Sequence, residues 1–199
     1  MVQLPCNDHE VSGSKHGGQD VPADLSFQRA STASTPFEFI DRQLVYFIPE
    51  NLKEALLAEI MKHEQVSNGI VYVRTNFAAD HLAEQLNRAG ITAEALHGNK
   101  SRRTSEKSVS NFKRSFTRIL VTTDSAAPRI EAMEISMLIN YDLPLSAETY
   151  TKRLHQHRGL RAASTRALSL CDDSEKRNLR NINRALLKEL EVIEHDWHR

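Results

Sequence analysis

The stretch Ile70-Val71-Tyr72-Val73 decides the fold class, because a short and uninterrupted apolar run is typical of a parallel strand that is covered on both faces. A segment of helical period precedes it over residues 51–63, and a second one follows it, which Asn76 can cap and Gly90 can end. The same alternation continues along the chain, and further strands are expected at residues 43–48, 91–96, 118–122, 135–141 and 167–171.

The later helical segments follow the same scheme. A polar helix that includes Val109, Phe112 and Phe116 is expected after residues 97–98, and Ser146 can cap a helix that runs to about His157. Ser174 precedes a long helical pattern that reaches Ile193. Under the right-handed crossover rule, this order predicts an α/β fold: a doubly wound, mostly parallel sheet with helices on both faces.

Composition indicates a single globular domain behind a tail. Of the 199 residues, 40% are hydrophobic and 26% are charged, and no apolar run approaches the roughly 18 residues of a membrane span. Residues 1–36 hold three of the seven glycines and three of the six prolines, so we expect a disordered tail there and a folded domain over residues 37–199. Cys6 and Cys171 do not form a secreted disulfide pattern, which favours the cytoplasm.

The overall charge hides a local imbalance. Lysine plus arginine and aspartate plus glutamate both number 26, so the formal net charge is zero. Residues 97–118, however, hold seven basic residues and one acidic residue, and residues 150–166 hold five basic residues and no acidic one. These stretches predict a basic face at the carboxyl ends of the strands that could bind a polyanion such as RNA. The alternative is that they are ordinary solvated helix faces.

The sequence lacks the common motifs for phosphate binding, for a nucleophilic serine and for a zinc site. The sequence contains neither G-x-x-x-x-G-K-[ST] nor G-x-G-x-x-G, and it has no G-x-S-x-G turn for a nucleophilic serine. The nine histidines do not show zinc-ligand spacing, so no metal site is expected. Ligands of open α/β sheets bind outside the carboxyl ends of the strands, and the residues to consider therefore begin at Arg74, His97, Thr123 and Asp142.

A family resemblance rests on motifs at these strand ends. They are Arg74-Thr75-Asn76, Ala95-Leu96-His97-Gly98-Asn99-Lys100-Ser101, Ile119-Leu120-Val121-Thr122-Thr123-Asp124 and Leu138-Ile139-Asn140-Tyr141-Asp142-Leu143-Pro144. Over residues 40–190 the sequence resembles the second RecA-like domain of DEAD-box RNA helicases, with the bacterial RhlE-like group as the best match. The family's first RecA-like domain, with its phosphate loop and D-E-A-D motif, has no counterpart in these residues.

The resemblance implies an RNA site along these motifs. Arg74, Gly98 and Thr123 would lie along RNA phosphates, which suits an arginine fork, an unhindered backbone N–H and a hydroxyl. For Thr123-Asp124, a simple turn after a strand explains the same residues. The full set of expected nucleic-acid-binding residues is Arg74, Thr75, Gly98, Asn99, Lys100, Arg102 and Thr123.

The sequence departs from the family pattern mainly in the motifs that the family uses to bind and hydrolyse ATP. Ala127-Pro128-Arg129-Ile130-Glu131 stands where the family has A-R-G-[IL]-D, and the family's Q-x-x-R is replaced at Arg102 and Ser105. Gln156 and Gly159 occupy the two arginine-finger positions, although a one-residue insertion would let Arg158 or Arg161 stand in. Losing both fingers would nearly abolish phosphoryl transfer. The residual nucleotide-site positions are Glu131, Arg153, Arg158 and Arg161.

Three functional hypotheses follow. The first is a stand-alone, degenerate helicase C-terminal domain that binds RNA or acts as an adaptor, with no ATPase of its own and therefore no cofactor. The second is half of a split ATP-dependent RNA helicase, in which ATP binds only when a separate first domain is supplied. The third is a protein–protein module without nucleic acid.

Overall fold

The computed structural model describes residues 42–63, 66–157 and 166–194. The expected tail, residues 1–36, lies outside them. In chain order the elements are β1 (Arg42–Phe47), η1 (Glu50–Leu52), α1 (Lys53–His63), β2 (Gly69–Tyr72), α2 (Asn76–Arg88), β3 (Ala93–Leu96), α3 (Arg102–Lys113), β4 (Ile119–Thr122), η2 (Ala127–Ile130), β5 (Met137–Asn140), α4 (Ala147–His155), β6 (Arg166–Cys171), η4 (Asp173–Glu175), α5 (Lys176–Leu186) and β7 (Glu191–Glu194).

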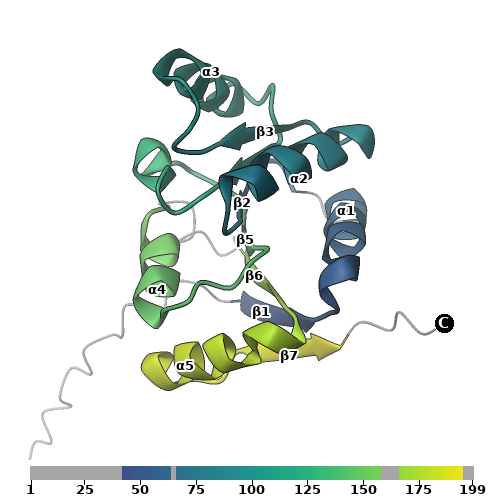
Figure 1. The fold of residues 1–199 in the computed structure, drawn as a ribbon, viewed down its shortest axis with the longest axis vertical. Helices are drawn as coiled ribbons and strands as arrows, with labels where there is room; N and C mark the ends of the chain where they lie inside the picture. The colour runs from purple at the N-terminus through teal and green to yellow at the C-terminus, as the bar shows by residue number, and fades with distance from the viewer. Residues whose placement is uncertain (1–41, 64–65, 158–165, 195–199) are drawn as a thin grey trace, which may run out of the picture. The chain divides into compact units, whose positions relative to one another are not determined.

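These strands form one seven-stranded sheet in the order β3-β4-β2-β5-β6-β1-β7, and each pair of neighbours is parallel. Figure 1 shows α1 and α2 on one side of the sheet and α4 on the other. The doubly wound α/β prediction is therefore confirmed. Strand β2, which carries the apolar run that decided the fold class, lies near the middle between β4 and β5.

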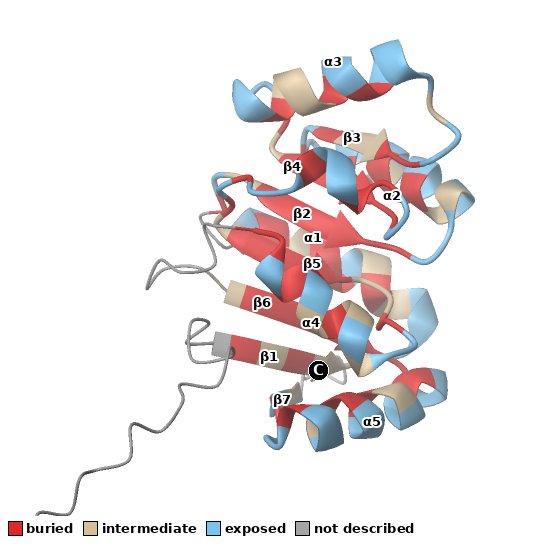
Figure 2. Cartoon of the chain, turned by 90° about the vertical axis from the view of Figure 1, so that its left-hand side faces the viewer, coloured by how far each residue is buried: buried red, intermediate tan, exposed pale blue. Residues whose placement is uncertain are grey.

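Two apolar clusters, one on each face, hold the layers together. Leu56, Leu82 and Leu86 of α1 and α2 pack with Val71 on one face, whereas residues of α3, α4 and α5 pack with Tyr72 on the other. Strands β2, β4 and β5 are buried along their whole length, as the red central strands of Figure 2 show. Burial on both faces explains why these strands read as continuous apolar runs.

The C-terminal pattern was interpreted wrongly as one long helix. Helix α5 ends at Leu186, because Leu187 turns into the left-handed region with φ of 50°. The chain then forms β7, which pairs with β1 at the edge of the sheet. The β-branched pair Val192-Ile193 suits a strand, and pairing satisfies backbone groups of β1 that a helix would leave unpaired. The expected helix with Phe116 also ends earlier, at Lys113.

Within the described residues, no helix is long and apolar enough to cross a membrane.

Candidate nucleic-acid interface

All seven strands run in the same direction, so the loops that follow them meet at one edge of the sheet, the carboxyl edge. Arg74 and Thr75 follow β2, Gly98 and Asn99 follow β3, and Thr123 follows β4. The order β3-β4-β2 makes these three strands direct neighbours. The structure therefore brings the three expected phosphate contacts together from segments that are far apart in the sequence.

The two residues after β2 are held by different interactions. The Thr75 hydroxyl accepts a hydrogen bond from the Ala78 backbone N–H at 3.0 Å and so caps α2. The Arg74 backbone N–H donates to Asp142 at 2.7 Å, and its guanidinium donates to Glu175 at 2.8 Å. The Arg74 side chain remains 50% exposed, which leaves part of its guanidinium facing solvent.

The loop after β3 is joined to the start of α2. Asp80 accepts from His97 Nε2 at 3.0 Å and pairs with Lys100 Nζ at 2.7 Å. Burial alone would raise the pKa of Asp80, but the bonds from Lys100 and His97 outweigh it and hold the pKa below its usual value. Gly98 and Asn99 are exposed between these anchors, so the Gly98 backbone is open to a ligand.

The loop after β4 is partly a local turn. The Thr123 hydroxyl is buried and lies 3.0 Å from the Ser125 hydroxyl, and the Thr123 carbonyl accepts from the Ala126 N–H at 3.0 Å. The turn explanation for this motif and its place at the carboxyl edge are thus both compatible with the structure.

Helix α3 begins beside this loop with exposed cations. Arg102 pairs with Glu106 at 2.7 Å, and Arg129 of η2 donates to the buried Ser105 hydroxyl at 2.7 Å. Together with Val109 these residues line a hollow of about 350 Å³. The guanidinium of Arg129 thus approaches Ser105 from the neighbouring element.

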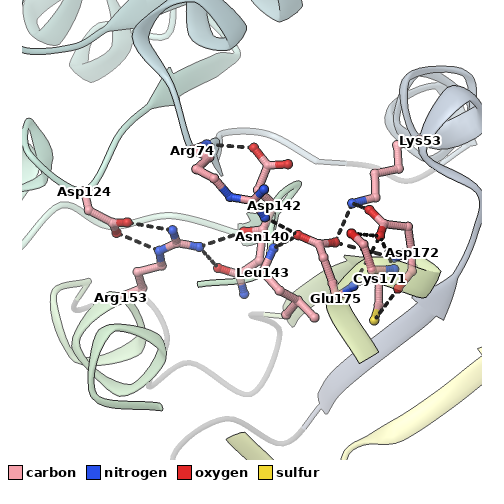
Figure 3. Close-up of polar contacts among 11 residues, drawn as sticks. Lys53, Arg74, Asp124, Asn140, Asp142, Leu143, Arg153, Cys171, Asp172 and Glu175 are labelled. Carbon is pink, nitrogen blue, oxygen red and sulfur yellow. Dashed lines mark hydrogen bonds and ion pairs between the residues drawn. The ribbon is translucent and has the colours of Figure 1, made fainter. Parts of the chain in front are cut away.

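Arg153 faces inward. It is 2% exposed, and its guanidinium binds both carboxylate oxygens of Asp124, at 2.7 and 2.8 Å, and the side-chain oxygen of Asn140 at 2.7 Å (Figure 3). It also lies 4.6 Å from the ring centre of Tyr72. Through these bonds Arg153 positions the loop after β4 against β5.

Glu175 is a central residue of this edge that sequence reasoning missed. Its carboxylate, 2% exposed, accepts from Lys53 at 2.5 Å, from Arg74 and from the Leu143 backbone N–H at 2.9 Å. Lys53 also pairs with Asp172 at 2.8 Å, and Figure 3 shows the three charges together. The capping box formed by Asp172 and Glu175 was the only sequence signal for this cluster.

Burial and ion pairing oppose each other in this cluster. Burial lowers the pKa of Lys53, but its two carboxylate partners outweigh that effect and raise the pKa above the usual value. Burial raises the pKa of Glu175, and the Lys53 ammonium only partly offsets the rise. For Asp172, the Lys53 and Ser174 bonds outweigh burial and lower the pKa. Ion pairing thus favours the charged forms of Lys53 and Asp172, whereas burial shifts Glu175 toward its neutral form.

Of the other expected nucleotide-site positions, only Glu131 falls within the described residues, and it lies near the end of α4. Ala132, next to Glu131, donates its N–H to the Gln156 carbonyl at 2.6 Å, so Glu131 lies near the segment that follows α4. The Gln156 side chain is buried and accepts from the Tyr72 hydroxyl at 3.3 Å. Gly159, Arg158 and Arg161 are outside the described residues.

His157 is also buried here. Its Nε2 lies 2.9 Å from the Tyr72 hydroxyl, while its Nδ1 has no hydrogen-bond partner among the described atoms. Burial lowers the pKa of His157 to about 4. The imidazole is therefore neutral at physiological pH.

The expected basic face is divided by the fold. Helix α3 runs back across the sheet, so Lys113 and Arg114 at its end lie toward the amino edge, as does Arg118, which bonds to Thr92 just before β3. At the carboxyl edge, Arg74, Lys100 and Arg102 are each paired with a carboxylate of this chain. The count of seven basic residues thus overstated the free positive charge at this edge, because the count could not include distant acidic partners.

No three histidine, cysteine, aspartate or glutamate side chains of the described segments converge as metal ligands.

The parallel sheet and its loops define a RecA-like domain, and comparisons with known proteins place it in a family. The family model for the helicase conserved C-terminal domain matches residues 51–163, and the chain belongs to this family. The chain is 33% identical to the RNA helicase CrhR of Synechocystis over 81% of its own length, and 33% identical to the RNA helicase DeaD of Buchnera aphidicola over 73%. These matches cover only 32% and 24% of the two relatives.

Solved structures show the same architecture. The DEAD-box protein SrmB of Escherichia coli, in a structure with the regulator of ribonuclease activity A, superposes with a TM-score of 0.72 and 25% identity. That match covers 79% of this chain and 92% of the SrmB chain. A DEAD-box protein from Methanococcus jannaschii superposes with a TM-score of 0.70 and 29% identity, covering 78% of this chain and 42% of that one.

Proposed function

We propose that this domain binds the sugar-phosphate backbone of RNA at the carboxyl edge of β3, β4 and β2 and acts as an RNA-binding or adaptor module without an ATPase of its own. The observation that carries the proposal is the convergence of Arg74, Gly98 and Thr123 from three adjacent strands. Arg74 offers a half-exposed guanidinium and Gly98 an open backbone, which are usual partners of phosphate oxygens, and the buried Thr123 hydroxyl lies behind them against Ser125. We also assign the chain to the RhlE-like group on its motifs.

The binding should depend only modestly on salt. RNA phosphates must compete with Glu175, Asp80 and Glu106 for the cations at this edge, so few counterions are released when RNA binds. Each phosphate neutralised on single-stranded RNA contributes about 0.7 to the slope of log affinity against log salt. We therefore expect the slope of log affinity against log salt to be negative and to correspond to only a few neutralised phosphates.

The lack of ATPase is inferred from the finger positions. The buried Gln156 side chain is bonded to Tyr72 and cannot carry positive charge, and Arg153 is held by Asp124. An arginine finger typically contributes a factor of about 10³ to 10⁵ to phosphoryl transfer. Without one, the domain would retain RNA binding but not hydrolysis.

Fluorescence anisotropy with a labelled single-stranded RNA, measured at several salt concentrations, tests the proposal. We expect saturable binding at about 50 mM salt that weakens as salt rises. Undetectable binding at that concentration, or affinity that does not change with salt, would reject it.

Half of a split helicase is the second candidate. The Ala132–Gln156 hydrogen bond favours it, because it places Glu131 beside the end of α4, and Arg158 follows Gln156 by two residues in the sequence. The test is RNA-stimulated ATP hydrolysis after mixing the chain with a separate first RecA-like domain. Stimulation above that domain alone supports this candidate and contradicts the adaptor proposal.

A further inference from the structure

An exposed pair of aromatic rings lies at the start of α2. The Phe77 side chain is 80% exposed, and its ring stacks on His81 one turn later, with ring centres 6.1 Å apart and planes inclined by 20°. Gln85, one further turn along, lies 3.3 Å from His81 Nε2 and so restrains the imidazole. The two exposed rings thus form one stacked surface.

This pair is surrounded by the residues of the proposed RNA edge. Phe77 is two residues beyond Thr75, which caps the same helix, and three residues beyond the half-exposed Arg74. Asp80, on the turn between the two rings, holds Lys100 and His97 of the loop after β3. The rings therefore lie on the exposed face of the first turns of α2, the helix that follows the β2 loop and that Asp80 connects to the β3 loop.

The size of the surface indicates what could bind it. A stable protein partner needs roughly 800 Å² on each side, far more than two rings offer. A nucleobase needs only one flat face, and stacking on an aromatic ring contributes a large share of the affinity of single-strand binding proteins. Backbone donors on both sides of the rings would hold the adjoining phosphates of the same strand.

We infer that Phe77, supported by His81, stacks on a base of the single-stranded RNA whose backbone lies along the carboxyl edge. This inference rests on the proposed function. It adds a contact with a base to an edge that otherwise offers contacts only to the backbone. Because every base has a flat face, the contact favours single strands over duplexes but does not select a sequence.

The test compares two ligands: a labelled single-stranded RNA and an abasic sugar-phosphate strand of the same length. With the full chain, the RNA should bind more tightly than the abasic strand. Phe77→Ala should weaken RNA binding by roughly 5- to 150-fold, the range measured for single stacked bases, and should leave abasic binding unchanged. Phe77→Trp should keep RNA binding and show quenching of its added fluorescence when RNA is bound.

Phe116→Ala is the matched control, because Phe116 is 67% exposed and lies beyond the end of α3, toward the amino edge. It should bind both ligands as the wild type does. An unchanged RNA affinity in Phe77→Ala overturns the inference and assigns the rings to a protein contact or to no contact. Equal losses for both ligands overturn it as well. If neither ligand binds the wild type, the proposed function itself fails, which is a different result.

Discussion

Replacing Lys53 with methionine removes the cation from the buried charge cluster behind the carboxyl edge. The Lys53 side chain is 1% exposed, and its ammonium group contacts Asp172 at 2.8 Å and Glu175 at 2.5 Å. Methionine has a similar volume and fills the space, so the effect is electrostatic and not a cavity. After the change, Glu175 keeps its bonds from Arg74 and the Leu143 backbone N–H, but Asp172 loses its only ion-pair partner among the described residues.

Breaking one side of a buried ion pair costs about 3 to 5 kcal/mol. For Lys53→Met we expect a cost near the lower end of this range, about 3 kcal/mol, because Glu175 keeps its contact with Arg74 and the Asp172 side chain is 11% exposed. The loss should also depend on pH. Burial already raises the pKa of Glu175, and removing Lys53 raises it further. A carboxyl whose folded pKa is raised gains stability as pH falls through that pKa, so the deficit against wild type is largest near pH 8 and shrinks toward pH 5.

Urea unfolding of the full chain, followed by circular dichroism at pH 8 and pH 5, measures both quantities. Lys152→Met is the matched control, because Lys152 is an exposed lysine of α4, and its change should be within about 0.5 kcal/mol. Lys53→Met combined with Glu175→Gln should recover part of the loss at pH 8. A Lys53→Met deficit below about 1 kcal/mol at pH 8, or one that grows toward pH 5, would refute the reasoning.

Three further predictions concern other parts of the same edge. Arg153→Lys keeps the positive charge but removes the guanidinium fork that binds Asp124 and Asn140. We expect urea unfolding to show a loss of about 2 to 4 kcal/mol in the free energy of unfolding. A loss under about 0.5 kcal/mol would contradict this role of Arg153. Because the pKa of His157 is lowered to about 4 in the folded state, protons bind the unfolded chain first, and about 2 kcal/mol of stability should be lost between pH 7 and pH 5. His157→Gln should remove this pH dependence; an unchanged slope would assign it to other groups. Asp80→Asn releases Lys100 at the carboxyl edge. It should tighten RNA binding and make the slope of log affinity against log salt more negative by about 0.7. Glu84→Gln on the same helix should change neither quantity.

The strands were predictable because each one carries its own signal. β2, β4 and β5 are buried on both faces, and such strands need continuous apolar residues whatever their neighbours are. β7 was missed for the opposite reason: Val192 and Ile193 fit the end of a helical period as well as they fit a strand. The left-handed turn at Leu187 that separates the two has no marker in the sequence, since leucine rarely adopts it.

The site residues divide in the same way. The place of Thr75, Gly98 and Thr123 at the carboxyl edge was predictable because they come shortly after strands, and topology brings strand ends together. The partners of Glu175 were not found, since Lys53 lies 122 residues away and comes from another helix. The role of Arg153 was equally hidden, because whether an arginine faces solvent or a buried carboxylate depends on the packing of α4 against the sheet.

This pairing changes what the neutral charge of the chain implies. A formal charge of zero would ordinarily mean weak attraction to RNA, and segment counting suggested that two basic stretches overcame it. The fold sends part of the first stretch toward the amino edge and pairs Arg74, Lys100 and Arg102 with carboxylates. Cations held in this way are oriented but partly neutralised, so they can position a phosphate without supplying much long-range attraction. Under the proposed function, affinity at such an edge comes largely from short-range contacts, to which the exposed Phe77 ring would add.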